Sequence, residues 1–153
     1  MLALLRPDEF NHPLLLHVGG AMLLVGALVA AGAALVQAAR LGPGQGAGLS
    51  RFGFRTLLVA AIPSFILMRV GAQWVASEEG LDDSDAAWIG LGYISTDAGV
   101  LFLIAATVTA GLTARRFTSG DARTGLSRVA PILTLLMVVV YLVVVWAMAT
   151  KPS

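Results

Sequence analysis

The stretch 132-ILTLLMVVVYLVVVWAM-148 decides the fold class of this chain, because it is long, continuously apolar and without charge. A helix of about 20 apolar residues spans the roughly 30 Å hydrocarbon core of a bilayer. Apolar and polar residues do not alternate here, as they would in a strand of a membrane barrel. The stretch therefore predicts a transmembrane helix that faces lipid or packs against other helices.

Three further apolar runs precede this one, and composition supports the same interpretation. Hydrophobic residues make up 58% of the 153 residues and charged residues 12%, whereas a soluble domain carries about 25% charge. We predict one domain, residues 1–153, with spans at about 13–39, 56–77, 87–114 and 129–149. Helices satisfy all their backbone polar groups internally, as lipid requires. The predicted fold is an all-α integral membrane four-helix bundle.

Local residues indicate how these helices bend and pack. Pro63 lies inside the second span, so a kink or local opening is expected there. Small residues at Ala27, at Ala30 or Ala31, and at Ala34 in the first span let helices approach closely. The glycine-rich stretch 41-LGPGQGAGLS-50 is interpreted as a flexible connector.

The charges between the spans predict an orientation. The first and third loops with their flanks are basic, apart from Asp121, and the second loop is acidic. The basic residues are Arg40, Arg51, Arg55, Arg115, Arg116, Arg123 and Arg128, and the acidic ones Glu78, Glu79, Asp82, Asp83 and Asp85. The positive-inside rule then predicts a multi-pass plasma-membrane protein with the acidic loop 78–85 and both termini outside. Trp74, Trp88 and Trp146 fall near this outer interface, where indole rings concentrate.

An arginine stands in the second span, in 66-ILMRVGAQW-74, where charge is expensive. Arg69 lies eight residues before Ser77, roughly 12 Å from the outer end of its span. Asp97 lies nine residues after Trp88, roughly 13 Å from the outer end of the third span. Opposite charges at one depth on neighbouring helices predict an Arg69–Asp97 ion pair.

Further polar residues extend this pair into a predicted cluster. Gln73 and Tyr93 are each one helical turn nearer the outside, and His17 enters the first span from the same side. We interpret His17, Arg69, Gln73, Tyr93 and Asp97 as an outward-facing buried polar cluster, whereas the inner half has almost nothing comparable. Three interpretations of these two charges stay open. The Arg69–Asp97 pair serves a substrate, ion or proton path, or it only fixes the register of the helices. Alternatively there is no pair, and Arg69 reaches the outer interface without Asp97.

His12 and His17 are the two histidines of the chain. Bis-histidine haem needs ligands from facing helices, and no other span contains a histidine. Three alternatives stay open for His17: an axial haem ligand, alone or shared across a dimer; a metal site with His12 and the acidic loop; or a hydrogen bond to backbone or headgroup. The cofactor is therefore unknown, with haem and a metal ion as candidates.

The run 17-HVGGAMLLVG-26 resembles the first-helix motif of small bacterial four-helix membrane proteins, namely the copper-resistance D-like family and related families of unknown function. His17, Gly20, Ala21 and Gly26 carry the match. The resemblance implies that His17 handles a metal or haem near the outer surface. The chain has only two histidines and no methionine cluster, unlike the copper-handling members.

Three classes of function follow from these residues. The first is proton- or ion-linked transport of a small solute, with Asp97 taking up or releasing a proton or cation beside Arg69. The second is a haem-, quinone- or metal-binding redox protein that uses His17. The third is a structural or accessory subunit of a larger membrane complex.

The expected partners are the lipid bilayer and either a second copy of the chain or a larger membrane complex. The net charge of +1 disfavours nucleic acid, and the lack of G-x-S-x-G and H-E-x-x-H disfavours a hydrolase.

Overall fold

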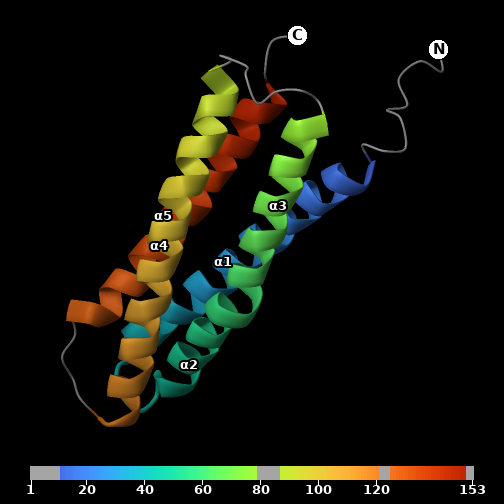
Figure 1. Cartoon of the computed structure of the whole chain (residues 1–153). Helices are drawn as coiled ribbons and strands as arrows, with labels where there is room; N and C mark the ends of the chain where they lie inside the picture. Colours follow the sequence, from blue (N-terminus) through green and yellow to red (C-terminus); the bar gives the residue numbers. More distant parts are fainter. Residues whose placement is uncertain (1–10, 79–86, 121–124, 151–153) are drawn as a thin grey trace.

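A computed structural model describes residues 11–78, 87–120 and 125–150 of the chain. These ranges are helical apart from short connections, and they contain no strand. The elements are α1 (Asn11–Leu41), α2 (Ala47–Thr56), η2 (Leu57–Ala61), α3 (Ile62–Glu78), α4 (Ala87–Thr118) and α5 (Gly125–Ala149). Because α2, η2 and α3 follow one another without a break, the chain forms four long helices (Figure 1). All four are long and apolar enough to cross a membrane, which confirms the predicted all-α fold with four candidate spans.

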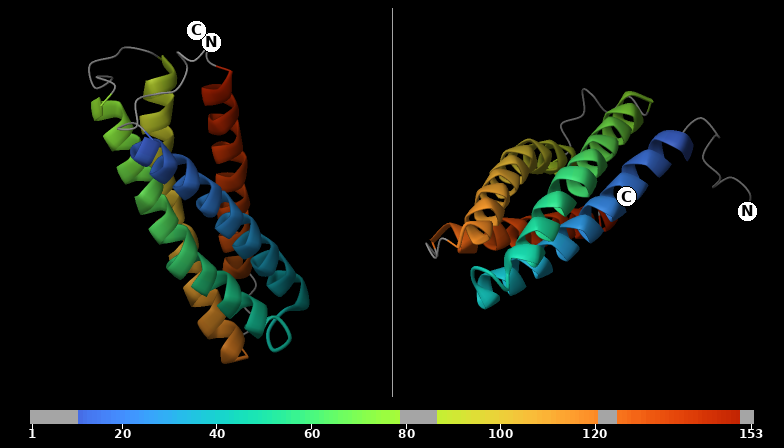
Figure 2. Two further views of the ribbon diagram at one scale, coloured as in Figure 1. Left: turned by 90° about the vertical axis from the view of Figure 1, so that its right-hand side faces the viewer. Right: turned by 90° about the horizontal axis from the view of Figure 1, so that it is seen from below.

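The four helices run up and down between two ends of the bundle. At the terminal end, α1 begins, α3 ends, α4 begins and α5 ends; the opposite end is called the connector end (Figure 1). α1 packs along α3 and also against α5, while α4 packs along α5. α2 packs against α4 near the connector end, but α3 and α4 are not among the packed pairs within the described residues. Figures 1 and 2 show α4 diverging from α3 toward the terminal end.

The second long helix begins at Ala47, nine residues before the predicted span 56–77. Two glycines close the preceding turn in the left-handed region, Gly42 at φ 74° and Gly44 at φ 85°, where glycine carries no Cβ penalty. The Gly46 N–H donates to the Gly42 carbonyl at 2.9 Å. The connector is thus residues 42–46 rather than the predicted 41–50, because this tight turn lets the next helix start at once.

The expected distortion at Pro63 is confirmed. Leu57–Ala61 is π-helical, and the Ile62 N–H bonds to the Leu57 carbonyl, five residues back. A proline in a helix lacks an N–H and its ring clashes with the carbonyl four residues earlier. Widening the helix by one residue before Pro63 relieves that clash, and single π turns of this kind recur in membrane helices.

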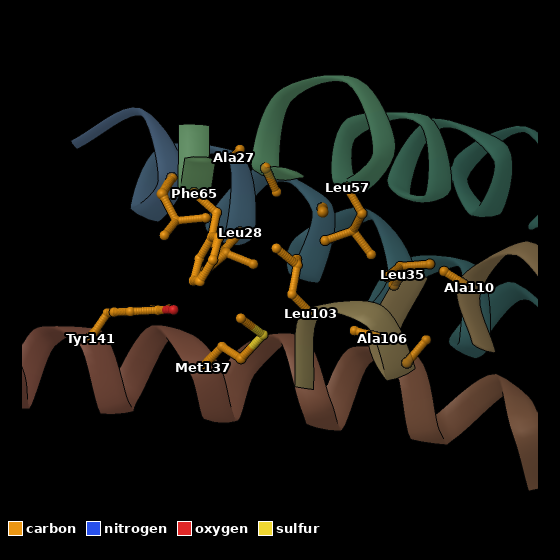
Figure 3. Packing of buried hydrophobic residues seen from close by; sticks show 14 of the residues in the cluster. Ala27, Leu28, Leu35, Leu57, Phe65, Leu103, Ala106, Ala110, Met137 and Tyr141 are labelled. Carbon is orange, nitrogen blue, oxygen red and sulfur yellow. The ribbon is translucent and has the colours of Figure 1, made fainter. Parts of the chain in front are cut away.

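The core lies between all four helices, and each of them contributes apolar side chains to it. Leu24, Leu28, Leu57 and Leu103 are fully or almost fully buried, together with Met137 of α5 (Figure 3). Fully burying such a side chain stabilises a fold by about 1.5–3 kcal/mol against water, although in lipid close packing replaces most of that driving force. The predicted small-residue stripe is part of this packing.

That stripe consists of Ala27, Ala31 and Ala34, which are buried, whereas Ala30 is exposed. Alanines on the packed face bring the backbones of neighbouring helices close.

Threonines inside the apolar helices form hydrogen bonds from their hydroxyls to the backbone of the same helix. The Thr134 hydroxyl, for example, donates to the Ala130 carbonyl at 2.7 Å, the usual bond to the carbonyl four residues earlier.

Candidate functional site

The predicted Arg69–Asp97 ion pair is present. An Nη atom of Arg69 on α3 lies 3.2 Å from an Oδ atom of Asp97 on α4. Asp97 lies ten residues from the first residue of α4, about 15 Å along the helix, and Arg69 nine residues from the last residue of α3, about 14 Å. The pair therefore sits in the terminal half of the bundle and connects the α1–α3 pair to α4.

The cluster is not buried within the chain, contrary to the sequence-based expectation. The side chain of Asp97 is 72% exposed and that of Arg69 is 26% exposed. The physical reason is that α3 and α4 diverge toward the terminal end (Figure 1), so that the long side chain of Arg69 bridges the space between them. Gln73 is also exposed. Tyr93 belongs to α4, but its side chain lies outside what the structure describes.

His17 is held against α3 by a hydrogen bond to backbone. Its Nδ1 lies 3.1 Å from the carbonyl oxygen of Met68, the residue before Arg69. With Nδ1 donating, Nε2 is left as an acceptor in the neutral ring. This geometry matches the predicted alternative in which His17 bonds backbone.

Two glycines make this contact available at the α1–α3 crossing. A Cβ at Gly20 would lie 2.5 Å from the Met68 nitrogen, and one at Gly71 would collide with the backbone of His17. Only glycine at both positions lets the two backbones approach this closely. The crossing thus places the His17 ring beside the residues that lead into Arg69.

A small cavity of about 60 Å³ lies beside the ion pair, between α1, α3, α4 and α5. Its polar lining residues are His17, Arg69, Thr96 and Tyr141. Tyr141 is only 6% exposed, and its hydroxyl has no hydrogen-bond partner among the described residues. A buried hydroxyl left unpaired costs about 1–3 kcal/mol. The cavity has room for a few waters or a small ion, which would pair this hydroxyl.

Tyr141 is not part of the predicted cluster, but it lines the cavity together with Arg69. It extends from α5 toward Phe65 and Met137 in Figure 3, and a Cβ at Gly99 of α4 would collide with its hydroxyl. A tyrosine in the apolar run 132–148 could have been noted as a buried polar group. Counting residues gives its depth, but its proximity to Arg69 and Thr96 becomes visible only when α5 is known to pack against α1 and α4.

The metal prediction gains no support from the described residues. His12 is exposed in the first turn of α1, and the described part of the chain holds no group of three His, Asp or Glu side chains able to bind one metal ion. The acidic loop invoked for this site lies outside the described residues, apart from Glu78. The cavity beside His17 is also far below the about 300–1,000 Å³ typical of small-molecule and cofactor sites.

A second cavity, of about 450 Å³, lies at the connector end between α2 and α4. Arg51, Arg55 and Arg115 line it. These three arginines belong to the basic loops and flanks that the sequence analysis used to predict the orientation, and the structure brings them together around one cavity. Arg51 and Arg55 are one helical turn apart on one face, a signal that becomes visible once α2 is known to begin at Ala47.

The fold and the terminal-end site together define a four-helix bundle whose helices are all candidate membrane spans, with an ion pair between two of them. No family model, curated protein or solved structure matches the chain.

Proposed function

We propose that this protein mediates proton- or ion-linked transport of a small solute through the site at the terminal end. One observation carries the proposal: Arg69, the ion-pair partner of Asp97, lines a cavity together with the buried hydroxyl of Tyr141, which has no hydrogen-bond partner among the described residues. Ionisable groups inside a membrane are costly, and they mark ion pathways and proton relays.

Asp97 is the group that takes up and releases the proton or cation. A deprotonated Asp97 binds Arg69 and draws α4 toward the α1–α3 pair, whereas a neutral Asp97 gives up the charge attraction. A change at one carboxylate thereby alters how the two sides of the bundle are joined. The cavity volume suits a proton carried by water, or a small ion, as the coupled species.

The polar lining gives such a species its contacts. The Tyr141 hydroxyl can donate or accept, His17 Nε2 can accept, and the Arg69 guanidinium donates. These three groups are enough for a buried water molecule, which needs two to four hydrogen-bond partners. The rest of the wall is apolar and includes Leu24 and Val25 of α1 and Val144 and Val145 of α5.

The test is proton flux into proteoliposomes that enclose a pH-sensitive dye, driven by an imposed pH gradient. We expect Asp97→Asn to lose the protein-dependent flux. The matched control is Glu78→Gln, which makes the same acid-to-amide change at an exposed residue in the last turn of α3. Flux through Asp97→Asn equal to that of the unmodified protein would refute the proposal.

A second candidate function, that of an accessory subunit, has its own supporting observation. Asp97 is 72% exposed on the side of the bundle, and a carboxylate facing lipid is costly. A partner helix packed over the space between α3 and α4 would remove that cost. In that case Asp97→Asn changes the mass of the purified assembly, measured by light scattering, and the reconstituted chain alone carries no flux.

A further inference from the structure

The cavity at the connector end combines a charged mouth with an apolar interior. Arg51, Arg55 and Arg115 supply the charges, and the described residues lining the cavity include no Asp or Glu. None of the three arginines forms an ion pair with a described carboxylate. Like charges around one space repel each other, so an anion bound there would be stabilised by all three.

One arginine is already held in position across the cavity. Arg51 on α2 donates from Nε and Nη2 to the Thr118 hydroxyl on α4, at 3.3 and 3.0 Å. The Thr118 hydroxyl in turn donates to the Ala114 carbonyl at 2.8 Å. The guanidinium has five donors, so others remain for an anion. This contact fixes the spacing of α2 and α4 at the mouth.

The interior of the cavity is apolar and runs along the membrane-spanning part of α4. Phe54, Val108 and Leu112 line it. Val108 lies ten residues before Thr118, about 15 Å along the helix, which is about half of a bilayer hydrocarbon core of roughly 30 Å. Phe54 rests on Gly111, where a Cβ would come within 3.0 Å of its ring. From Val108 to Thr118 the cavity thus follows about 15 Å of α4.

We propose that this cavity binds an anionic phospholipid. The headgroup phosphate is bound by Arg51, Arg55 and Arg115, since guanidinium groups bond phosphate oxygens in a forked geometry. One acyl chain lies along Phe54, Val108 and Leu112. Basic pockets at the ends of transmembrane helices are the expected sites for acidic headgroups. A soluble phosphate compound would use the mouth but would leave the apolar interior uncovered.

The test uses the full-length protein in a neutral detergent, with thermal unfolding followed by tryptophan fluorescence. Added phosphatidylglycerol should raise the melting temperature, and phosphatidylcholine should not. The triple variant Arg51→Gln, Arg55→Gln, Arg115→Gln should bind phosphatidylglycerol about a hundredfold more weakly, since each arginine near the headgroup adds roughly fivefold. All three arginines are exposed, so their substitution leaves the packed core intact.

The matched control removes three arginines near the same end that do not line the cavity: Arg40→Gln, Arg116→Gln, Arg128→Gln. It should retain the lipid effect, and an equal loss there would overturn the proposal in favour of general charge attraction. An equal shift with inorganic phosphate would overturn it in favour of a soluble anion. Val108→Trp keeps every charge and fills the interior, so it should also weaken lipid binding. If the triple variant fails to fold, unchanged binding by Val108→Trp refutes the proposal.

Discussion

The Nδ1 atom of His17 lies 3.1 Å from the carbonyl oxygen of Met68, which links α1 to α3 one residue before Arg69. The two helices come close enough for this hydrogen bond because Gly20 and Gly71 place no side chain at their crossing. This hydrogen bond holds the His17 ring beside the backbone that leads into Arg69. The polar site is therefore set by a backbone packing feature as much as by its charged residues.

Gly20→Ala should destabilise the protein by about 1–3 kcal/mol, because its Cβ would lie 2.5 Å from the Met68 nitrogen and must push α1 from α3. Thermal unfolding followed by tryptophan fluorescence measures the change. Gly19→Ala is the matched control, because no atom lies within 4 Å of its added Cβ. Gly19→Ala should be neutral or stabilise by up to about 1 kcal/mol through helix propensity. Equal effects of the two variants would show that the crossing is not closely packed.

Asp97→Asn and Arg69→Gln form a double-mutant cycle for the ion pair. We expect a coupling free energy above the roughly 0.2–1 kcal/mol of ion pairs exposed to water, because the exposed parts of both side chains face lipid or detergent. A pair fully buried in protein would instead show a loss of about 3–5 kcal/mol when one partner is removed. The cycle is measured by unfolding in micelles. Strict additivity of the two single variants would show that the residues do not interact.

Gly99→Ala tests the position of the Tyr141 hydroxyl. The new Cβ would collide with that hydroxyl, so we expect a loss of about 1–3 kcal/mol in unfolding free energy. Adding Tyr141→Phe removes the colliding oxygen and should recover more than half of this loss. Tyr141→Phe alone should lower flux in proteoliposomes and should not destabilise the protein, because it removes a buried hydroxyl that has no partner among the described residues. A Gly99→Ala variant that Tyr141→Phe does not rescue would place the hydroxyl elsewhere.

The sequence was sufficient to predict the helical class, the four spans and the Arg69–Asp97 pairing. Apolar runs fix span number because lipid leaves few backbone alternatives, and depth follows from counting residues at constant helical rise. The distortion near Pro63 was predictable for the same local reason. Each of these features depends on residues that are close in sequence, or on the depth of a residue along its own helix.

The features that could not be predicted depend on which helices pack together. The exposure of Asp97 follows from the divergence of α3 and α4, which no residue pattern indicates. The place of Tyr141 beside the ion pair depends on α5 packing against α4 and α1. The early start of α2 was hidden because glycines in 41–50 favour a connector by composition, although only residues 42–46 form one.

The central claim is that the Arg69–Asp97 pair joins the α1–α3 pair to α4 at the terminal end. The most direct test is the distance between spin labels at Val70→Cys and Ile94→Cys, two exposed positions beside the pair on α3 and α4. The chain has no cysteine of its own, so the labels attach only where intended. We predict a single narrow distance distribution, which becomes longer and broader when Asp97→Asn is added. An unchanged distribution in the Asp97→Asn background would contradict the claim.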